Sequence, residues 1–258
     1  MKTRLVLGDI HGHFDHVENL YNKHNPDIVI CLGDYVDSFV IQPEEHKACL
    51  EKLFALKKQH EEKHGKNTFI MVLGNHDFHY IMAGEKYSGW NPSTAKLCRG
   101  LICEGIDTGV IKMVHVDYLN KTIYSHAGVT NTWMNEWDVK HLGDINDLSM
   151  RAFRFTYGDS WSSSGDSKYN GPLWVRPFAL SKDMYNDTEG VMWRQIVGHT
   201  HTKQVIDFSS DMFAVEKRVP LYVNDNLPFG YIVETLSDDG KLEDCIIVQH
   251  DFEETYEQ

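Results

Sequence analysis

Residue types that bind metal ions recur in this sequence beside glycines, each time directly after a short apolar run. The first three groups are GDIHG at residues 8–12, GDYVD at 33–37 and GNHD at 74–77. SHAG at 125–128 and GHTH at 198–201 follow later apolar runs. Carboxylate, amide and imidazole groups form a mixed oxygen and nitrogen ligand set, and seven such ligands suit two divalent cations better than one. The candidate ligands are Asp9, His11, Asp34, Asn75, His126, His199 and His201.

The elements that must position these groups predict an α/β fold. Apolar runs at 4–7, 27–32 and 68–73 are typical of buried strands, and each ends at a glycine. Residues 13–23 and 43–63 carry apolar side chains at helical spacing. This βαβαβ order predicts a parallel sheet with helices on its faces. Groups that follow the carboxyl ends of such strands converge on one crevice.

The second half of the chain has a different pattern. Residues 108–126 predict two strands with a turn near 119–121, and strands predominate from residue 195 onward. Residues 131–171 are irregular, with a Ser/Gly-rich loop at 160–165. We therefore expect a single domain over 1–250. Insertions at about 78–107 and 131–171 would form a cap or cleft wall, and an acidic tail would occupy 251–258.

Composition excludes several classes of function. The 258 residues carry 38 acidic and 25 basic side chains, and the net charge of -13 disfavours nonspecific binding to nucleic acid or an anionic membrane. Apolar runs stay well short of the roughly 18 residues that a membrane span needs, and the first residues do not resemble a signal peptide. Five irregularly spaced cysteines indicate a reducing, cytoplasmic compartment.

Together the five glycine-flanked groups resemble the signature blocks of the calcineurin-like metallophosphoesterases. Their order and form most resemble the phosphoprotein phosphatase branch, in particular its bacterial and phage lambda-type Ser/Thr phosphatases. LWVR at 173–176 and the strands of 221–236 resemble further segments of that branch. The resemblance covers roughly 3–236. It implies a metallophosphoesterase-type β-sandwich with flanking helices and a two-metal site at the C-terminal ends of the strands.

The resemblance also implies a role for each residue of the site. Metal one would take Asp9, His11, Asp34 and His201, and metal two would take Asn75, His126 and His199, with Asp34 bridging both ions. The ions would be Mn²⁺, with Fe or Zn as alternatives. A metal-bridging hydroxide would attack phosphorus. His76 would protonate the leaving oxygen, Asp37 would orient the His76 ring, and Arg176 would clamp the phosphate.

One position departs from the phosphatase branch. That branch continues GDxxD with Arg-Gly, and the arginine grips the phosphate, whereas this chain has Ser38-Phe39. The departure weakens the protein-phosphatase hypothesis and leaves the two-metal hydrolase untouched. Basic residues of the two insertions are candidate replacements, or else ordinary surface residues: Lys96, Arg99, Arg151 and Arg154.

Other histidines and the aromatic residues of the insertions leave alternatives open. His13 either supports the first group or begins a helix, and His79 either lines the cleft or is structural. Six more are expected on solvated faces or helix ends: His16, His24, His46, His60, His64 and His250. The aromatic residues either form the core of a cap or stack on a nucleobase or peptide: Tyr80, Tyr87, Trp90, Trp133, Trp137 and Trp161.

Three functions are weighed on these grounds. The first is a two-metal phosphoesterase that hydrolyses phosphomonoesters, with phosphoserine or phosphothreonine in proteins as substrate. The second is a nucleotide-directed hydrolase of dinucleoside polyphosphates or phosphodiesters, motivated by the missing arginine and the aromatic insertions. The third is a noncatalytic binding protein, which is disfavoured because such proteins usually lose metal ligands and every ligand position here is filled.

Overall fold

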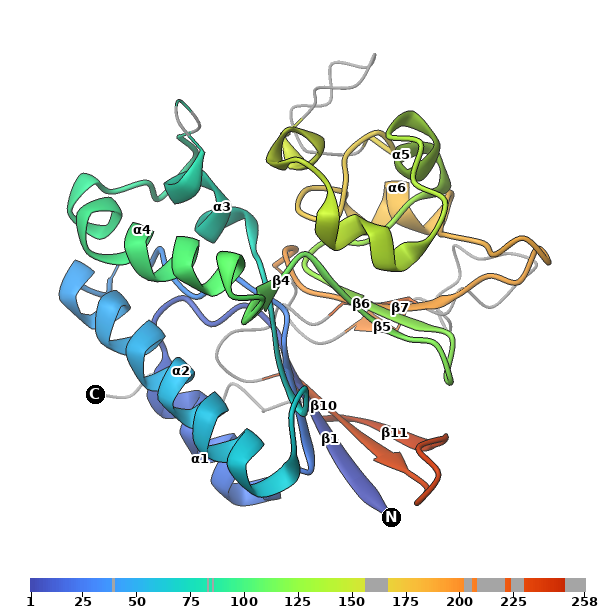
Figure 1. Cartoon of the computed structure of the whole chain (residues 1–258), viewed down its shortest axis with the longest axis horizontal. Coiled ribbons are helices and arrows are strands. Elements are labelled where there is room, and N and C mark those ends of the chain that lie inside the picture. Colours follow the sequence, from blue (N-terminus) through green and yellow to red (C-terminus); the bar gives the residue numbers. More distant parts are fainter. Residues whose placement is uncertain are drawn as a thin grey trace.

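The computed structural model of this protein is a β-sandwich in which two sheets face each other and helices cover the outside (Figure 1). It describes residues 1–38, 40–82, 84, 86–155, 167–201, 206–207, 221–223 and 230–248. No helix in these ranges is both long and apolar enough to cross a membrane.

The first sheet has the strand order β11-β10-β1-β2-β3-β4. Its strands are β1 (Lys2–Leu7), β2 (Ile28–Cys31), β3 (Phe69–Val72), β4 (Ile111–Lys112), β10 (Tyr231–Leu236) and β11 (Leu242–Val248). Strands β1 to β4 pair in parallel, as the βαβαβ pattern predicts, and β10 joins β1 in antiparallel pairing. The ends of β1, β2 and β3 therefore meet at one edge, where the first three groups lie.

The second sheet has the order β5-β6-β7-β9-β8. Its strands are β5 (Val114–Asp117), β6 (Thr122–Ser125), β7 (Arg194–Val197), β8 (Ile206–Asp207) and β9 (Leu221–Val223). Strands β6 and β7 are parallel neighbours, so the two groups that follow them, SHAG and GHTH, emerge side by side.

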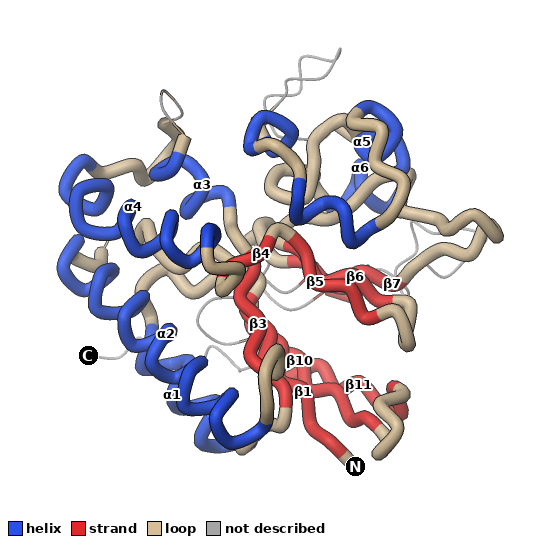
Figure 2. Tube along the Cα trace, viewed as in Figure 1, coloured by secondary structure: helices blue, strands red, loops and turns tan. Residues whose placement is uncertain are grey.

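The long helices cover the first sheet on the face turned away from the second (Figures 1 and 2). They are α1 (Phe14–His24), α2 (Pro43–His64) and α4 (Pro92–Asp107), and the short α3 (Asn75–Ile81) begins within GNHD. Over the second sheet lie α5 (Asn131–Glu136), α6 (Pro177–Ser181), and the 3₁₀ turns Leu142–Asp147 and Met150–Phe153.

Strand alternation separates the two layers of the core. In β1, Leu5 and Leu7 belong to the core beneath the helices, whereas Val6 packs between the sheets. Tyr124 of β6 and Ile196 of β7 meet Val6 from the second sheet. Because both faces of β1 are buried over its second half, Leu5, Val6 and Leu7 form a continuous apolar run.

A buried ionic network also joins the two sheets. The Arg4 guanidinium, on β1, donates to Asp117 of the second sheet at 2.8 Å and to Glu234 at 3.1 Å. Glu234 also accepts hydrogen bonds from Tyr124 at 2.6 Å and from Arg194 of β7. Since Arg4 is 5% exposed and Glu234 is fully buried, each charge depends on its partners.

The predicted strands and helices of the first half are confirmed, and one expectation for the second half is corrected. The apolar run at 110–118 is two strands, because the chain leaves the first sheet after β4 and enters the second at β5. Asn146 stabilises this crossing, where its Oδ1 accepts from the backbone N–H of Met113 at 2.9 Å and of Val114 at 3.1 Å. The Ser/Gly-rich loop at 160–165 and the tail at 251–258 lie outside the described residues.

Two histidines expected on solvated faces are buried. His46 is 2% exposed and accepts from the Ser38 N–H, and His60 is 1% exposed between Tyr21 and the Asp27 carbonyl. Both lie on the face of α2 that also carries Leu50 and Leu53, so the polar residue type, and not the helical spacing, accounts for the wrong expectation. His250 lies beyond the described residues.

The aromatic residues of the insertions divide between core and surface. Tyr80 and Trp133 are buried in the core, and Tyr87 and Trp90 are partly buried against it. Trp137 is 38% exposed, and Trp161 lies outside the described part of the chain.

Candidate metal and acid–base centre

Loops at the ends of five strands bring the candidate ligands together at the mouth of the sandwich. Asp9 follows β1, Asp34 follows β2 and Asn75 follows β3, while His126 and His199 follow β6 and β7 of the other sheet. All five are buried, with exposures of 8% or less.

Two glycines allow this convergence. A Cβ on Gly74 would lie 2.0 Å from Oδ1 of Asp34, and a Cβ on Gly33 would lie 2.6 Å from the backbone nitrogen of Gly74. Only glycine permits β2 and β3 to end so close to one another, and this contact brings the Asp34 carboxylate against the start of α3.

Acceptor atoms of both sheets face each other in this buried space. The Nδ1 atom of His126 donates to the Leu32 carbonyl at 2.9 Å, which leaves the lone pair of Nε2 pointing toward Oδ2 of Asp34 at 3.5 Å. Likewise, Nδ1 of His11 donates to the Val36 carbonyl at 3.0 Å, so its Nε2 faces Asp34 at 3.9 Å and Asp9 at 4.0 Å.

Asn75 extends this acceptor cluster toward GHTH. Its Oδ1 lies 2.7 Å from Nε2 of His126 and 2.9 Å from Nδ1 of His199. The backbone N–H of His199 donates to Oδ1 of Asp9 at 3.1 Å, which fixes the GHTH loop against the first strand.

The histidines of this cluster are neutral. Burial lowers the pKa of His126 to about 3 and that of His11 to about 4. Burial, together with the neighbouring His126 and Arg176, lowers the pKa of His199 well below its ordinary value. Imidazoles without an extra proton present lone pairs to the carboxylates, and a divalent cation is the partner that such an arrangement fits. Asp9, Asp34 and His126 alone bring three ligand atoms within 4.8 Å of one another.

Four residues in the loops that carry the candidate ligands have a left-handed backbone conformation. His11, Asp34, Asp37 and His199 all have a positive φ, between 46° and 67°. A left-handed conformation costs a non-glycine residue roughly 1–3 kcal/mol, and such residues cluster where side chains must be aimed. Four of the candidate site residues therefore adopt a costly conformation that directs their side chains into the site.

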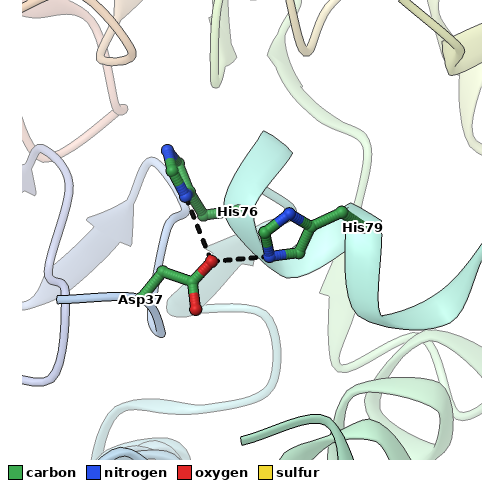
Figure 3. Close-up of side chains that lie close together, drawn as sticks. All are labelled: Asp37, His76 and His79. Carbon is green, nitrogen blue, oxygen red and sulfur yellow. Dashed lines mark hydrogen bonds and ion pairs between the residues drawn. The ribbon is translucent and has the colours of Figure 1, made fainter. Parts of the chain in front are cut away.

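Beside the ligand cluster, Asp37 contacts two histidines of α3 (Figure 3). Its Oδ2 atom lies 3.2 Å from Nδ1 of His76 and 2.5 Å from Nε2 of His79. Its Oδ1 atom accepts a hydrogen bond from the hydroxyl of Tyr80. Burial alone would raise the pKa of Asp37, but the hydrogen bonds from His76, His79 and Tyr80 outweigh it and lower that pKa.

His76 differs from the ligand histidines in charge. Burial lowers its pKa, but the charge of Asp34 and the hydrogen bond to Asp37 outweigh that effect and raise it to about 9. Its side chain is 23% exposed, so the ring is reachable from outside. A protonated imidazole beside a cluster of buried metal-type ligands can donate a proton to a bound molecule.

Asp77 is a site residue whose role the sequence did not reveal. Its Oδ1 accepts from the backbone N–H of Tyr35 at 2.9 Å and of Val36 at 3.3 Å, and its Oδ2 accepts from Gly74 at 3.0 Å. One fully buried carboxylate thus connects the loop that carries Asp34 to the loop that carries Asn75. The only indication of this role in the sequence is that Asp77 is the last residue of GNHD.

Comparison with known proteins identifies the family. The family model described as calcineurin-like phosphoesterase matches residues 3–205. The chain belongs to this family. The calcineurin-like phosphoesterases depend on two metal ions, and the protein is accordingly a metal-dependent phosphoric ester hydrolase. Its substrates are phosphorylated compounds.

Solved structures show the same fold at low sequence identity. One is a protein serine/threonine phosphatase from Saccharomyces cerevisiae with similarity to human phosphatase PP5. The two chains share 14% sequence identity with a TM-score of 0.56, and the matched region covers 97% of this chain and 80% of the yeast chain. Another, assigned as a diadenosine tetraphosphatase, has 14% identity and a TM-score of 0.52, covering 97% of this chain and 95% of that one. No curated protein matches this calcineurin-like phosphoesterase in sequence.

The remaining expected residues of the phosphoesterase lie at the margin of the cluster. The Nη1 atom of Arg176 donates to the His199 carbonyl at 2.8 Å and to Oγ1 of Thr200 at 3.2 Å. His201 is exposed on the same loop, and its proximity is one of the causes that lower the pKa of His11. The four candidate replacements for the missing arginine all have exposed side chains: Lys96, Arg99, Arg151 and Arg154.

Proposed function

We propose that this phosphoesterase hydrolyses phosphomonoesters, with phosphoserine or phosphothreonine in proteins as its substrate class. The observation that supports this best is the juxtaposition of two kinds of histidine. Neutral His11 and His126 face Asp34 in the ligand cluster, while a protonated His76 lies alongside, held by Asp37. Cation binding and proton donation are the two functions that phosphomonoester hydrolysis requires.

The metal ions would be held by residues from both sheets. One would take Asp9, His11, Asp34 and His201, and the other Asn75, His126 and His199, with Asp34 shared. When bound, two divalent cations neutralise phosphate charge and lower the pKa of water. The mixed ligand set favours Mn²⁺, with Fe and Zn as alternatives.

His76 would act as the general acid. Its Nδ1 is engaged by Asp37 at 3.2 Å, so Nε2 on the other side of the ring is the atom that can deliver a proton to the leaving oxygen. Asp37 holds the ring orientation and favours the protonated state.

Arg176 would bind the phosphate oxygens. Its Nη1 is fixed by the GHTH loop, and its charge lowers the pKa of both His126 and His199, which indicates that the guanidinium lies near the cluster. A guanidinium anchored in this way can present its remaining N–H groups to phosphate.

A nucleotide-directed hydrolase is the second candidate. Ser38 occupies the position where the protein-phosphatase branch has its phosphate-gripping arginine. The half-buried Tyr87 also provides aromatic surface near the site, because its ring lies 4.5 Å from that of the buried Trp174, which in turn contacts the His199 ring. Both features would suit a substrate with a base, such as a dinucleoside polyphosphate.

Activity assays test the proposal and separate the two candidates. With Mn²⁺, the purified protein should hydrolyse p-nitrophenyl phosphate and a phosphoserine peptide. Asp34→Asn should abolish turnover of both esters, and His76→Asn should abolish turnover of the peptide, whose alkoxide leaving group needs the general acid. Full activity in both variants would contradict the mechanism. Turnover of a phosphopeptide, diadenosine tetraphosphate and a cyclic nucleotide should then be compared, and a preference for either nucleotide would favour the second candidate. Elemental analysis that finds no metal would favour a noncatalytic role.

A further inference from the structure

The carboxylate of Asp37 is held by more partners than the acid–base pair requires. Besides His76, it contacts His79 and Tyr80, and its side chain is 1% exposed. His79 and Tyr80 belong to the segment that follows GNHD, whereas His76 lies within that group.

The contacts of His79 fix its tautomer and its orientation. The backbone N–H of Tyr87 donates to Nδ1 of His79 at 3.4 Å, so the proton is on Nε2, 2.5 Å from Oδ2 of Asp37. The fully buried ring is stacked on Tyr87, with centroids 6.1 Å apart, and meets the edge of Tyr80 at 4.4 Å. His79 therefore has little freedom to leave the carboxylate.

Tyr80 is anchored in the same way. Its hydroxyl donates to Oδ1 of Asp37 and accepts from the backbone N–H of Asn91 at 3.2 Å. Asn91 in turn caps α4 through the N–H of Ser93 at 2.8 Å. A Cβ on Gly89 would lie 3.2 Å from Oδ2 of Asp37, so this part of the chain packs directly on the carboxylate.

These contacts describe a polar support of the Asp37 carboxylate rather than another metal site. Asp37, His76 and His79 could be grouped as ligands of one ion. However, two ligands bonded at about 2.0 Å in tetrahedral geometry are roughly 3.3 Å apart. At 2.5 Å, Asp37 and His79 are too close to be two ligands of one ion and are in direct polar contact with each other.

We propose that His79 and Tyr80 are positioning residues for proton transfer, holding Asp37 so that it aims His76 at the leaving oxygen. The inference rests on the proposed function, in which His76 is the general acid. The proton moves from Nε2 of His76 to the leaving oxygen as the P–O bond breaks, and His79 and Tyr80 retain their own protons. The insertion at 78–107 thereby acquires a role in catalysis through Asp37.

Leaving-group dependence tests this role. Nitrophenolate leaves phosphorus without a proton, whereas the alkoxide of a phosphoserine peptide needs the general acid. In His79→Leu and Tyr80→Phe, we expect kcat for the phosphoserine peptide to fall about 10- to 100-fold, the cost of a misplaced catalytic group. With p-nitrophenyl phosphate, kcat should fall less than about threefold, because that reaction needs little of the acid.

Matched variants distinguish positioning from general damage. His79→Gln keeps an N–H near Nε2 and should recover most of the peptide activity. His60→Leu and Tyr231→Phe remove a buried imidazole and a buried hydroxyl away from the site and should change both substrates equally.

The outcomes separate this inference from the proposed function. An equal loss on both substrates in His79→Leu and Tyr80→Phe overturns the inference alone. Wild-type protein that binds metal and hydrolyses neither ester overturns the proposed function, and the inference with it. Independently of activity, the Nε2 proton of His79 should give a downfield NMR resonance that Asp37→Asn abolishes, and its absence from the wild type would also contradict the inference.

Discussion

Replacing Asp77 with asparagine should separate the two loops that carry the central ligands. The carboxylate accepts from Tyr35 and Val36 through Oδ1 and from Gly74 through Oδ2. An amide has one acceptor oxygen only. In Asp77→Asn its NH₂ group must therefore face one of these backbone N–H groups, donor against donor.

The expected cost follows from these contacts. Burial and the neighbouring charge of Asp34 raise the pKa of Asp77, so the value for a neutral acceptor, about 0.5–1.5 kcal/mol, applies to its hydrogen bonds. A buried donor left without a partner costs about 1–3 kcal/mol. Asp77→Asn should thus lower the free energy of unfolding by roughly 2–4 kcal/mol, a large part of the 5–15 kcal/mol typical of a folded protein. A displacement of about 1 Å between Asp34 and Asn75 should lower kcat about 100-fold.

Urea denaturation followed by tryptophan fluorescence measures the first effect, and kcat well below the unfolding midpoint measures the second. Asn146→Ala is the control, because it also removes an acceptor of two backbone N–H groups, at the crossing from β4 to β5 and outside the candidate ligand set. It should lower stability and leave kcat intact. Wild-type stability and kcat in Asp77→Asn, or an equal loss of kcat in Asn146→Ala, would refute the reasoning.

Three further predictions concern stability. Glu234→Gln, which weakens the partner of Arg4 and Arg194, should cost about 3–5 kcal/mol in urea denaturation; a loss below 1 kcal/mol would contradict it. Burial and the nearby His64 lower the pKa of His60 below 6.5, so the free energy of unfolding should fall as pH decreases below that value, and less so in His60→Leu. Chelation should lower the free energy of unfolding by about 2.7 kcal/mol relative to protein with free metal at 100 times Kd, and an unchanged urea midpoint would exclude binding at this site.

The first half of the fold was predictable because local sequence and tertiary structure agree there. Runs such as LVL at 5–7 and IVICL at 28–32 are apolar on both faces, as central parallel strands must be, and Gly33 and Gly74 mark positions where no side chain fits. The convergence of Asp9, Asp34 and Asn75 then follows from parallel pairing alone.

The structural features that the sequence did not predict depend on contacts between residues of different elements. The apolar spacing of 110–118 does not say that its two halves pair with different sheets. His46 and His60 are polar residue types usually found at the surface, yet they share the buried face of α2 with Leu50 and Leu53. His79 is held against Asp37 because the backbone N–H of Tyr87, later in the chain, donates to the other nitrogen of the imidazole. No spacing rule predicts that contact.

The ligand cluster draws Asp9 and Asp34 from one sheet and His126 and His199 from the other. A bound metal pair is therefore a cross-link that closes one end of the sandwich, much as a disulfide closes a loop. A second connection between the sheets is the buried ionic network near the starts of β1 and β7, formed by Arg4, Arg194 and Glu234. If these residues hold the metal pair as proposed, metal affinity would depend on how well the two sheets are aligned, and a change in the packing between them would alter cation binding without replacing a ligand.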